Sequence, residues 1–485
     1  MTPFDQPPAW VSDAIFYQIF PDRFAASTRW AKPAGLEAWD SPPTTYGYKG
    51  GDLAGVIEQL DYLSDLGINA LYFNPIFASA SNHRYHAWDY RRIDPLLGDR
   101  ELFDELVTAC HERGIRVVID GVFNHCGRGF YQFHDLLESG EASPWRDWFN
   151  VHSWPVDAYS VNAPNYDAWW GLPALPKFDT DNPEVREFLM QIGEYWAHRG
   201  IDGWRLDVPL EIRTEGFWEE FRRRVRAVNP DLYILAEIWD DASEWINDGD
   251  RFDATMNYLF AGHTLAFVAG DRIPGELADG LSYPLKPALD ATQYAAAIDH
   301  LLNMYPWSRT VVNFNLLDSH DVPRVLSLCG GDPTSVILAT LLQMTFPGTP
   351  SVYYGTEVGM AGGKDPANRA GFPWDRTQWN QEIYQAHRQL IALRHAEPTL
   401  RHGEMELLPT DPGSMLYIFT RRCDRDIVVV AINAGTDAVS AMTQLSIGTS
   451  FKTLWGDGGI AGDANSLRVA LPPRSGAVWK VTDLS

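Results

Sequence analysis

The chain has 485 residues, enough for about three average domains or for one α/β barrel with smaller additions. Its 45% hydrophobic and 21% charged residues are a globular composition, which excludes a disordered, collagen-like or coiled-coil protein. The 64 acidic and 39 basic residues give a formal charge of −25, which repels nucleic acids and anionic membranes, so we predict neither as a partner.

Nothing in the sequence resembles a secretion or membrane signal. The first ten residues are Pro-rich and lack the basic and apolar regions of a signal peptide. No run approaches the ~18 apolar residues of a membrane helix. The four cysteines have neither CxxC spacing nor the density of a disulfide framework. We therefore expect a cytoplasmic protein with reduced thiols.

Short apolar runs alternate with helical patterns through the first 400 residues. We expect strands at residues 14–20, 69–73, 115–122, 203–207, 232–237, 254–256, 311–317 and 351–354. We expect helices at residues 52–66, 101–113, 183–192, 216–228, 335–346 and 378–394. Eight strands that alternate with helices predict an α/β fold with a closed TIM (β/α)8 barrel rather than an open sheet, and no GxGxxG follows the first strand.

Two segments depart from this alternation. Residues 123–178 are rich in Trp, Pro and Asn without clear periodicity, which predicts a subdomain inserted after strand 3. After residue 397, short alternating strands separated by turn residues predict a C-terminal all-β sandwich. The predicted division is a barrel from residues 1–122 and 179–397, an inserted subdomain at 123–178 and a β-domain at 398–485.

Acidic residues follow several predicted strands at their carboxyl ends, where barrel enzymes carry their chemistry. The fourth, fifth and seventh strands deliver Asp207, Glu237 and Asp321 to this rim, and Arg205 shares a strand face with Asp207. A single acid at a strand end is usually a cap or surface residue, but three acids with an arginine and two histidines favour a catalytic site. Arg205 is expected to keep Asp207 ionised, while burial among negative neighbours would raise the pKa of Glu237.

Four segments of the sequence resemble those of a known family. Residues 120–125, 203–207, 237–239 and 317–321 are similar to the conserved regions of the α-amylase family of glycoside hydrolases, glycoside hydrolase family 13. The match extends from residues 17–24 to the β-rich tail.

The resemblance implies a retaining double displacement on α-1,4 bonds of maltooligosaccharides, cyclodextrins or starch. It implies that Asp207 is the nucleophile, that Glu237 is the acid and base, and that Asp321 grips the sugar hydroxyls. It also implies a set of substrate contacts, namely Tyr85, His125, Arg205, His320, Lys177, Trp239, Asp365 and Arg369. Lys177 is otherwise a solvated loop lysine, and Asp365 with Arg369 is otherwise a loop-stabilising ion pair. Asp120 is expected to brace Arg205.

Within this family, the sequence is most similar to the branch that contains cyclomaltodextrinase, neopullulanase and maltogenic amylase. The similarity lies in residues 50–53, 175–179, 354–357 and 362–366. The N-terminal β-domain of that branch has no counterpart here, so both a monomer and a homodimer are open. The resemblance allows calcium, and Asn124 is either such a ligand or a link between loops. Because residues 25–29 replace the Asn- and Asp-rich calcium loop of relatives, we predict no strong calcium site there and no required cofactor.

Two other functions are compatible with parts of the sequence. A glucanotransferase of the same family would use identical catalytic residues, so the motifs do not distinguish it from a hydrolase. An inactive barrel that only binds sugars or a partner typically lacks one of the three carboxylates, and all three are present here.

Overall fold

The computed structural model describes residues 6–409, 411–443, 449–463 and 466–482. Eight parallel strands form one sheet in the order β8-β7-β6-β5-β2-β1-β10-β9. Their bounds are β1 Phe16–Ile19, β2 Ala70–Phe73, β5 Arg116–Gly121, β6 Gly203–Leu206, β7 Tyr233–Ala236, β8 Ala254–Thr255, β9 Phe314–Leu316 and β10 Thr349–Tyr353. A parallel bridge between Met256 and Phe314 joins the two edge strands and closes the barrel. The predicted TIM barrel is therefore confirmed.

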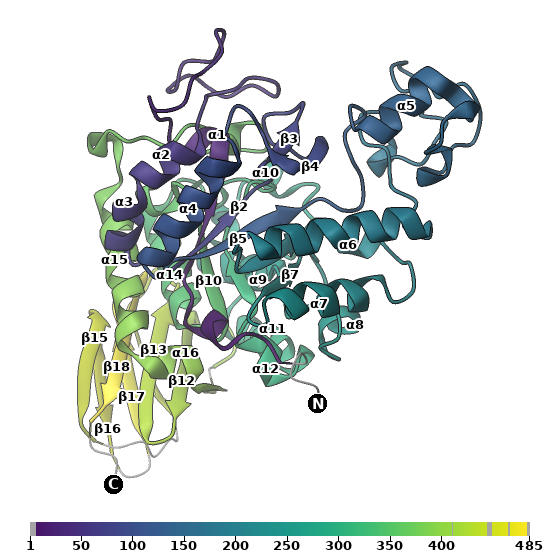
Figure 1. Cartoon of the computed structure of the whole chain (residues 1–485). Coiled ribbons are helices and arrows are strands. Elements are labelled where there is room, and N and C mark those ends of the chain that lie inside the picture. Colours follow the sequence, from purple (N-terminus) through teal and green to yellow (C-terminus); the bar gives the residue numbers. More distant parts are fainter. Residues whose placement is uncertain (1–5, 410, 444–448, 464–465, 483–485) are drawn as a thin grey trace.

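The strands are short and nearly every residue in them is buried, as expected where helices cover one face of a parallel sheet and side chains fill the other. The helices surround the strands (Figure 1). Those before the insertion are α1 Pro21–Phe24, α2 Leu53–Glu58, α3 Leu60–Leu66 and α4 Arg100–Glu112. Those after it are α6 Pro183–His198, α7 Phe217–Val228, α8 Ser243–Ile246, α9 Tyr258–Val268, α10 Gly275–Ala278, α11 Ala291–Met304, α12 Trp307–Thr310, α13 Val325–Leu328, α14 Pro333–Thr345, α15 Gln381–Ala396 and α16 Pro398–His402.

Several elements differ from their predicted ranges. The helix predicted at residues 52–66 is divided at Gln59 into α2 and α3, although its apolar positions stay buried on both sides of the break. The strand predicted at 311–317 begins only at Phe314, because residues 307–310 form α12. Helix α9 was not predicted, because it is apolar on all sides and so lacks the period of an amphipathic helix.

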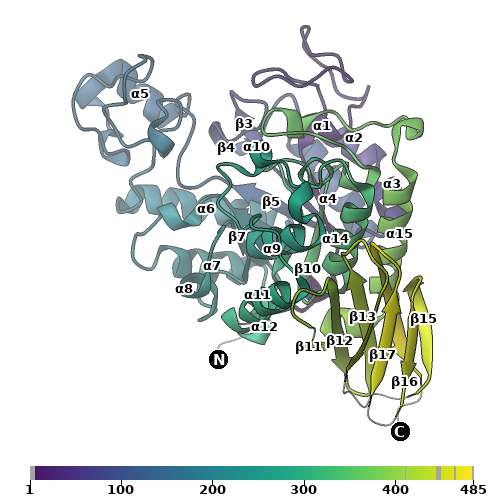
Figure 2. The same ribbon diagram turned by 180° about the vertical axis from the view of Figure 1, so that it is seen from behind.

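The inserted segment leaves the barrel after β5. It contains α5 Tyr131–Ser139 and several single helical turns, including η4 Trp169–Gly171. Both views show the part around α5 projecting from the barrel, on the side opposite to the C-terminal strands (Figure 1, Figure 2). A hairpin of β3 Phe77–Ser79 and β4 Ala87–Ile93 follows β2.

The C-terminal part consists of two antiparallel sheets packed around one apolar cluster, as predicted. The larger has the order β11-β12-β13-β18-β15 and the smaller β14-β17-β16. Their strands are β11 Glu404–Leu407, β12 Leu416–Cys423, β13 Asp426–Asn433, β14 Val439–Thr443, β15 Phe451–Gly456, β16 Gly459–Gly462, β17 Leu467–Leu471 and β18 Ser475–Val481. The residue boundaries predicted between the three parts of the chain stay a prediction.

Candidate active site

Asp207 and Glu237 lie at the ends of the neighbouring strands β6 and β7, and Asp321 lies in the loop after β9. Asp120 on β5 is in register with Arg205 on β6. Asp207 and Glu237 directly follow β6 and β7, and their backbone N–H groups continue the sheet ladder to Gly121 and Leu206. Strand pairing therefore places these four side chains at one rim.

Arg205 is the centre of the acidic cluster and is fully buried. Its Nη1 lies 3.0 Å from Oδ1 of Asp120 and 3.0 Å from Oδ1 of Asp207. Its Nη2 lies 3.1 Å from Oε2 of Glu237 and 3.9 Å from Oδ2 of Asp321. One guanidinium thus contacts or approaches four carboxyl groups, and Asp120 braces it as predicted.

Burial and repulsion between like charges both disfavour the ionised form of carboxyl groups that surround one cation. Burial, and next the charge of Glu237, raise the pKa of Asp207 well above its usual range despite the opposing effect of Arg205. The same two causes raise the pKa of Asp321 to about 7. The expectation that Arg205 keeps Asp207 ionised was therefore wrong in direction, because burial by the surrounding loops outweighs the charge of Arg205. The cluster therefore retains protons to a higher pH than isolated carboxyl groups do.

One backbone donor and one indole donor hold the Glu237 carboxyl group. Val208 N–H donates to Oε2 at 3.0 Å, and the indole N–H of Trp239 donates to Oε1 at 3.1 Å. Val208 has φ 36°, a left-handed conformation that a β-branched residue seldom adopts, and this turns its N–H toward Glu237. Trp239 in turn stacks on Tyr258 with ring centroids 3.9 Å apart.

A chain of hydrogen bonds fixes the positions of Tyr85 and His320. The Gln18 amide donates to Nδ1 of His320 at 2.9 Å, so the ring carries its proton on Nε2. That Nε2–H donates to the Tyr85 hydroxyl at 2.6 Å, and Tyr85 donates to Asp120 at 2.8 Å. Burial, and then the charge of Arg369, hold the pKa of His320 well below its usual range, which keeps the ring neutral.

Sequence reasoning missed the supporting members of this network. Gln18 also donates to Asn74 at 3.1 Å, and Tyr72 donates to Asp120 at 2.8 Å. The available signal was a polar residue, Gln18, within an otherwise apolar buried strand.

His125 lies where the inserted segment meets the barrel. Its ring is parallel to that of Trp169, with centroids 6.1 Å apart. Its Nε2 is buried and accepts or donates no hydrogen bond among the residues that the structure describes, and burial lowers the pKa of His125 to about 3. The ring is therefore neutral and keeps one nitrogen free for a ligand. Asn124 contacts Nδ1 of the adjacent His125 at 3.2 Å, and its role as a calcium ligand or as a link between loops stays a prediction.

The remaining predicted substrate contacts all have protein partners. Lys177 pairs with His125 in a β-bridge, and its Nζ lies 2.8 Å from Oε2 of Glu211, so it is not a bare solvated lysine. Arg369 Nη1 lies 3.2 Å from Oδ1 of Asp365, and its Nε donates to the carbonyl of His320.

The loop after β1 does not fit a calcium ion. Asp52 is the buried carboxylate facing it, and its Oδ2 lies 2.7 Å from the ammonium of Lys32 and accepts the N–H of Ser27. Lys32 already supplies a positive charge beside Asp52, and Ala25 and Ala26 offer only backbone oxygens to a hard cation. In the described part of the chain, no three His, Cys, Asp or Glu side chains form a metal-binding group. That the protein needs no cofactor stays a prediction.

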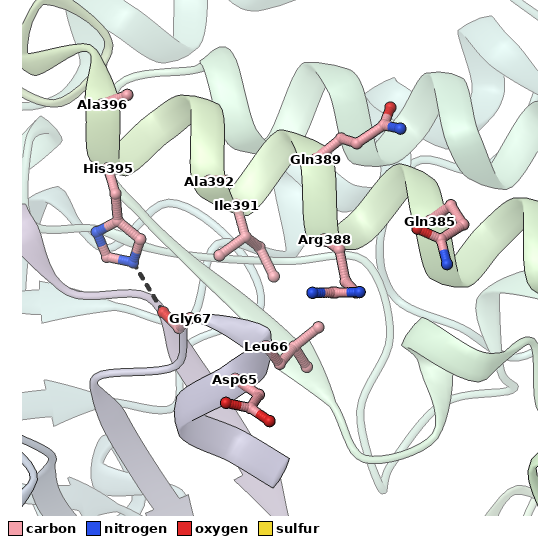
Figure 3. Close-up of a pocket in the computed structure, with 10 residues that line it drawn as sticks. All are labelled: Asp65, Leu66, Gly67, Gln385, Arg388, Gln389, Ile391, Ala392, His395 and Ala396. Atoms are coloured by element: carbon pink, nitrogen blue, oxygen red, sulfur yellow. Dashed lines mark hydrogen bonds between the residues drawn. The ribbon is translucent and has the colours of Figure 1, made fainter. Parts of the chain in front are cut away.

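A hollow lies away from the acidic cluster, between α3 and α15 (Figure 3). Its ten lining residues include Asp65 and Arg388, and the His395 ring is hydrogen-bonded to the carbonyl of Gly67. None of them comes from the carboxyl end of a barrel strand. Separately, no helix within the described ranges is both long enough and apolar enough to cross a bilayer.

Comparison with known proteins agrees with this geometry. The family model "Alpha amylase, catalytic domain" matches residues 18–403. The chain is 42% identical to a cyclomaltodextrinase of Geobacillus thermopakistaniensis (strain MAS1), over 98% of this chain and 78% of that one. The solved debranching enzyme from Nostoc punctiforme is 50% identical, with a TM-score of 0.91 over 98% of this chain and 99% of its own. A cyclic α-maltosyl-(1→6)-maltose hydrolase from Arthrobacter globiformis is 37% identical, with a TM-score of 0.87 over 98% and 100% of the two chains. The chain therefore belongs to the α-amylase family of glycoside hydrolases, in the branch that includes the cyclomaltodextrinases.

Proposed function

We propose that the protein is a retaining α-glucan hydrolase acting on α-1,4 bonds of maltooligosaccharides, cyclodextrins or starch. The observation that carries the proposal is the convergence of Asp207, Glu237 and Asp321 on Arg205 at one barrel rim. The names of the relatives, a cyclomaltodextrinase among them, support α-glucans as the substrate class.

In the first step, a carboxylate oxygen of Asp207 attacks the anomeric carbon while Glu237 donates its proton to the departing glycosidic oxygen. The carbon–oxygen bond breaks, the leaving sugar departs with a new hydroxyl, and the donor sugar stays esterified to Asp207. Arg205 holds Oδ1 of Asp207 in place at 3.0 Å. The Val208 N–H and the Trp239 indole orient Glu237 for proton transfer.

In the second step, Glu237 takes a proton from water as the water oxygen attacks the same carbon and releases Asp207. Two inversions leave the anomeric configuration unchanged. Asp321 accepts hydrogen bonds from the sugar hydroxyls beside the reacting carbon. Neutral His125 and His320 contact the same sugar ring, and the free Nε2 of His125 suits a hydroxyl group. Tyr85 supports the ring by stacking, since it is parallel to His320.

Further side chains lie where we expect the additional sugars of a longer glucan to bind. We assign Asp365 and Arg369 to the second donor sugar, since Arg369 is tied to the His320 carbonyl. We assign Trp239 to the acceptor side because its indole reaches the proton-donating Glu237. Lys177 belongs to the same rim, where it is held by Glu211.

The decisive experiment is turnover of maltose, maltotriose, β-cyclodextrin, pullulan and starch, with products separated by chromatography and their initial anomer determined by NMR. We expect short maltooligosaccharides in the α-configuration. Asp207→Asn removes the nucleophile and should abolish turnover while the variant stays folded by circular dichroism. Near-normal activity of this variant, or β-configured products, would refute the mechanism.

The same product analysis tests the alternative of a glucanotransferase. With maltotriose, each transfer to a second sugar releases one glucose or maltose for every longer product, whereas hydrolysis yields glucose and maltose alone. Early amounts of longer products close to those of glucose plus maltose would therefore identify transfer as the main reaction. Pullulan is included among the substrates to test for cleavage of α-1,6 bonds. The names of two relatives, a debranching enzyme and a hydrolase of a cyclic α-maltosyl-(1→6)-maltose, are the reason for this choice.

A further inference from the structure

We propose that Trp170 is an aromatic platform that binds a glucosyl unit of a long or cyclic α-glucan, outside the catalytic rim. The inference rests on the proposed function and adds a distant binding position to it. It would make Trp170 a residue that discriminates long glucans from short ones.

The first observation is the exposure of Trp170. Its side chain is 80% exposed, although an indole is among the largest apolar groups in proteins. An exposed flat apolar ring suits the apolar face of a pyranose, whose hydroxyl groups lie around its edge. Scattered exposed apolar residues are common, however, so exposure alone does not carry the inference.

The second observation is the backbone of Trp170, which has φ 49° and ψ 23°. This left-handed conformation costs little for glycine but is strained for a large side chain. Glycine would suit the position better for folding and would also remove the exposed ring. A residue that is unfavourable on both counts is better explained by a ligand than by the fold.

The third observation links Trp170 to the site. Trp170 stacks on Trp169 with ring centroids 5.1 Å apart and planes 19° apart, and Trp169 lies parallel to the ring of His125. Three near-parallel rings thus lead from the catalytic rim to solvent. The middle ring, Trp169, is half-buried and supports the outer one.

Backbone contacts hold this series in place relative to the barrel. Trp169 N–H donates to the carbonyl of Leu175 at 2.9 Å, and Ala168 forms a β-bridge with Pro176. The next residue, Lys177, is bridged to His125. The loop that carries Trp170 is therefore fixed to the strand end that carries His125, which a binding platform requires.

The test compares Trp170→Gly, Trp170→Phe and the wild-type protein on maltotriose and maltoheptaose. We expect Trp170→Gly to raise KM for maltoheptaose about 3- to 10-fold with kcat unchanged, the range of a lost aromatic stacking contact. Kinetics on maltotriose should not change, and Trp170→Phe should be close to wild type because it keeps a flat ring. The melting temperature of Trp170→Gly should be equal or higher, since the backbone strain is relieved.

A matched control is Tyr131→Ala. Tyr131 is 64% exposed in the same inserted segment and packs edge-to-face on Trp145, away from the ring series. Its loss should leave KM for both substrates unchanged. Binding can also be measured without turnover, by calorimetry with maltoheptaose in the Asp207→Asn background, where Trp170→Gly should weaken Kd by the same factor.

Each other outcome overturns the platform. An unchanged KM for maltoheptaose shows that no sugar stacks on Trp170. An equal rise for maltotriose shows a general distortion of the site, and a lower melting temperature shows a structural role. A change in sedimentation without a change in KM shows a contact with a second copy of the chain. If the wild-type protein hydrolyses no α-glucan, the proposed function fails first; if it does and Trp170→Gly matches it, only the platform fails.

Discussion

Nη1 of Arg205 lies 3.0 Å from Oδ1 of Asp120, and neither side chain is exposed to solvent. The two residues are in register on β5 and β6, so the pairing of the strands alone brings them together. Asp120 thereby holds Nη1, which it shares with Asp207, while Nη2 of the same guanidinium faces Glu237 and Asp321.

Asp120→Asn should therefore lower both stability and activity. Breaking one partner of a buried ion pair costs about 3–5 kcal/mol, and Arg205 would turn toward the remaining acids. We expect a loss of this size in the free energy of unfolding by urea and a fall in kcat of at least about tenfold. Asp61→Asn is the control, because Asp61 pairs with Arg113 on the surface, where ion pairs contribute about 0–1 kcal/mol. Equal effects of the two substitutions would contradict the bracing role.

The pH profile of activity should reflect the raised pKa of Asp207. In the proposed mechanism the free enzyme uses this group as a carboxylate, so kcat/KM should fall as the pH drops through its raised pKa. Because the charge of Asp321 contributes to that rise, Asp321→Asn should shift the acidic limb of the residual activity to lower pH. An acidic limb that stays in place in this variant would show that the two groups are not coupled.

The buried Glu357 should make the free energy of unfolding depend on pH, independently of catalysis. It is fully buried, and the hydroxyls of Tyr17 and Tyr62 donate to its Oε1. Burial raises its pKa from 4.5 to about 7. Between these two pKa values the folded state keeps a proton that the unfolded chain has released. The resulting contribution of Glu357 to the free energy of unfolding is fully present below the unfolded pKa and is lost as the pH rises through about 7.

Glu357→Gln keeps the acceptor for both tyrosines and removes the titration. As the pH rises through this window, the free energy of unfolding by urea should decrease more for the wild-type protein than for the variant. The expected difference is about 1.4 kcal/mol for each pKa unit of the shift. Parallel stability curves for the two proteins would exclude Glu357 as the source.

Lys32 should make the loop after β1 independent of divalent cations. Its Nζ lies 2.7 Å from Oδ2 of Asp52 and donates to the carbonyl of Leu96 at 3.0 Å. We expect a chelator to leave the melting temperature unchanged, and Lys32→Met to destabilise the protein by about 1–3 kcal/mol through the unpaired Asp52. Lys452→Met, at an exposed lysine of β15, is the neutral control. A large loss of stability on chelation would reveal a metal site that we do not predict.

The barrel could be predicted because its strands are short, buried and regularly spaced, and because β8, although only two residues long, occupies its place in that spacing. Helix α9 could not be predicted from periodicity, since tertiary packing buries it on nearly every side. The positions of Asp207, Glu237 and Asp321 followed from strand ends, which meet at one rim in any parallel barrel.

The sequence by itself determined the fold, the three acids and Arg205 beside Asp207, because strand periodicity and strand-end position are local properties of the chain. Only the tertiary structure decided how protons are shared among the acids, that Gln18 sets the tautomer of His320, and that Lys32 neutralises Asp52. These depend on burial and on contacts between residues far apart in the chain, and no local pattern encodes either. The strained, exposed Trp170 belongs to the same class, since its backbone angle and its ring neighbours exist only in the folded loop.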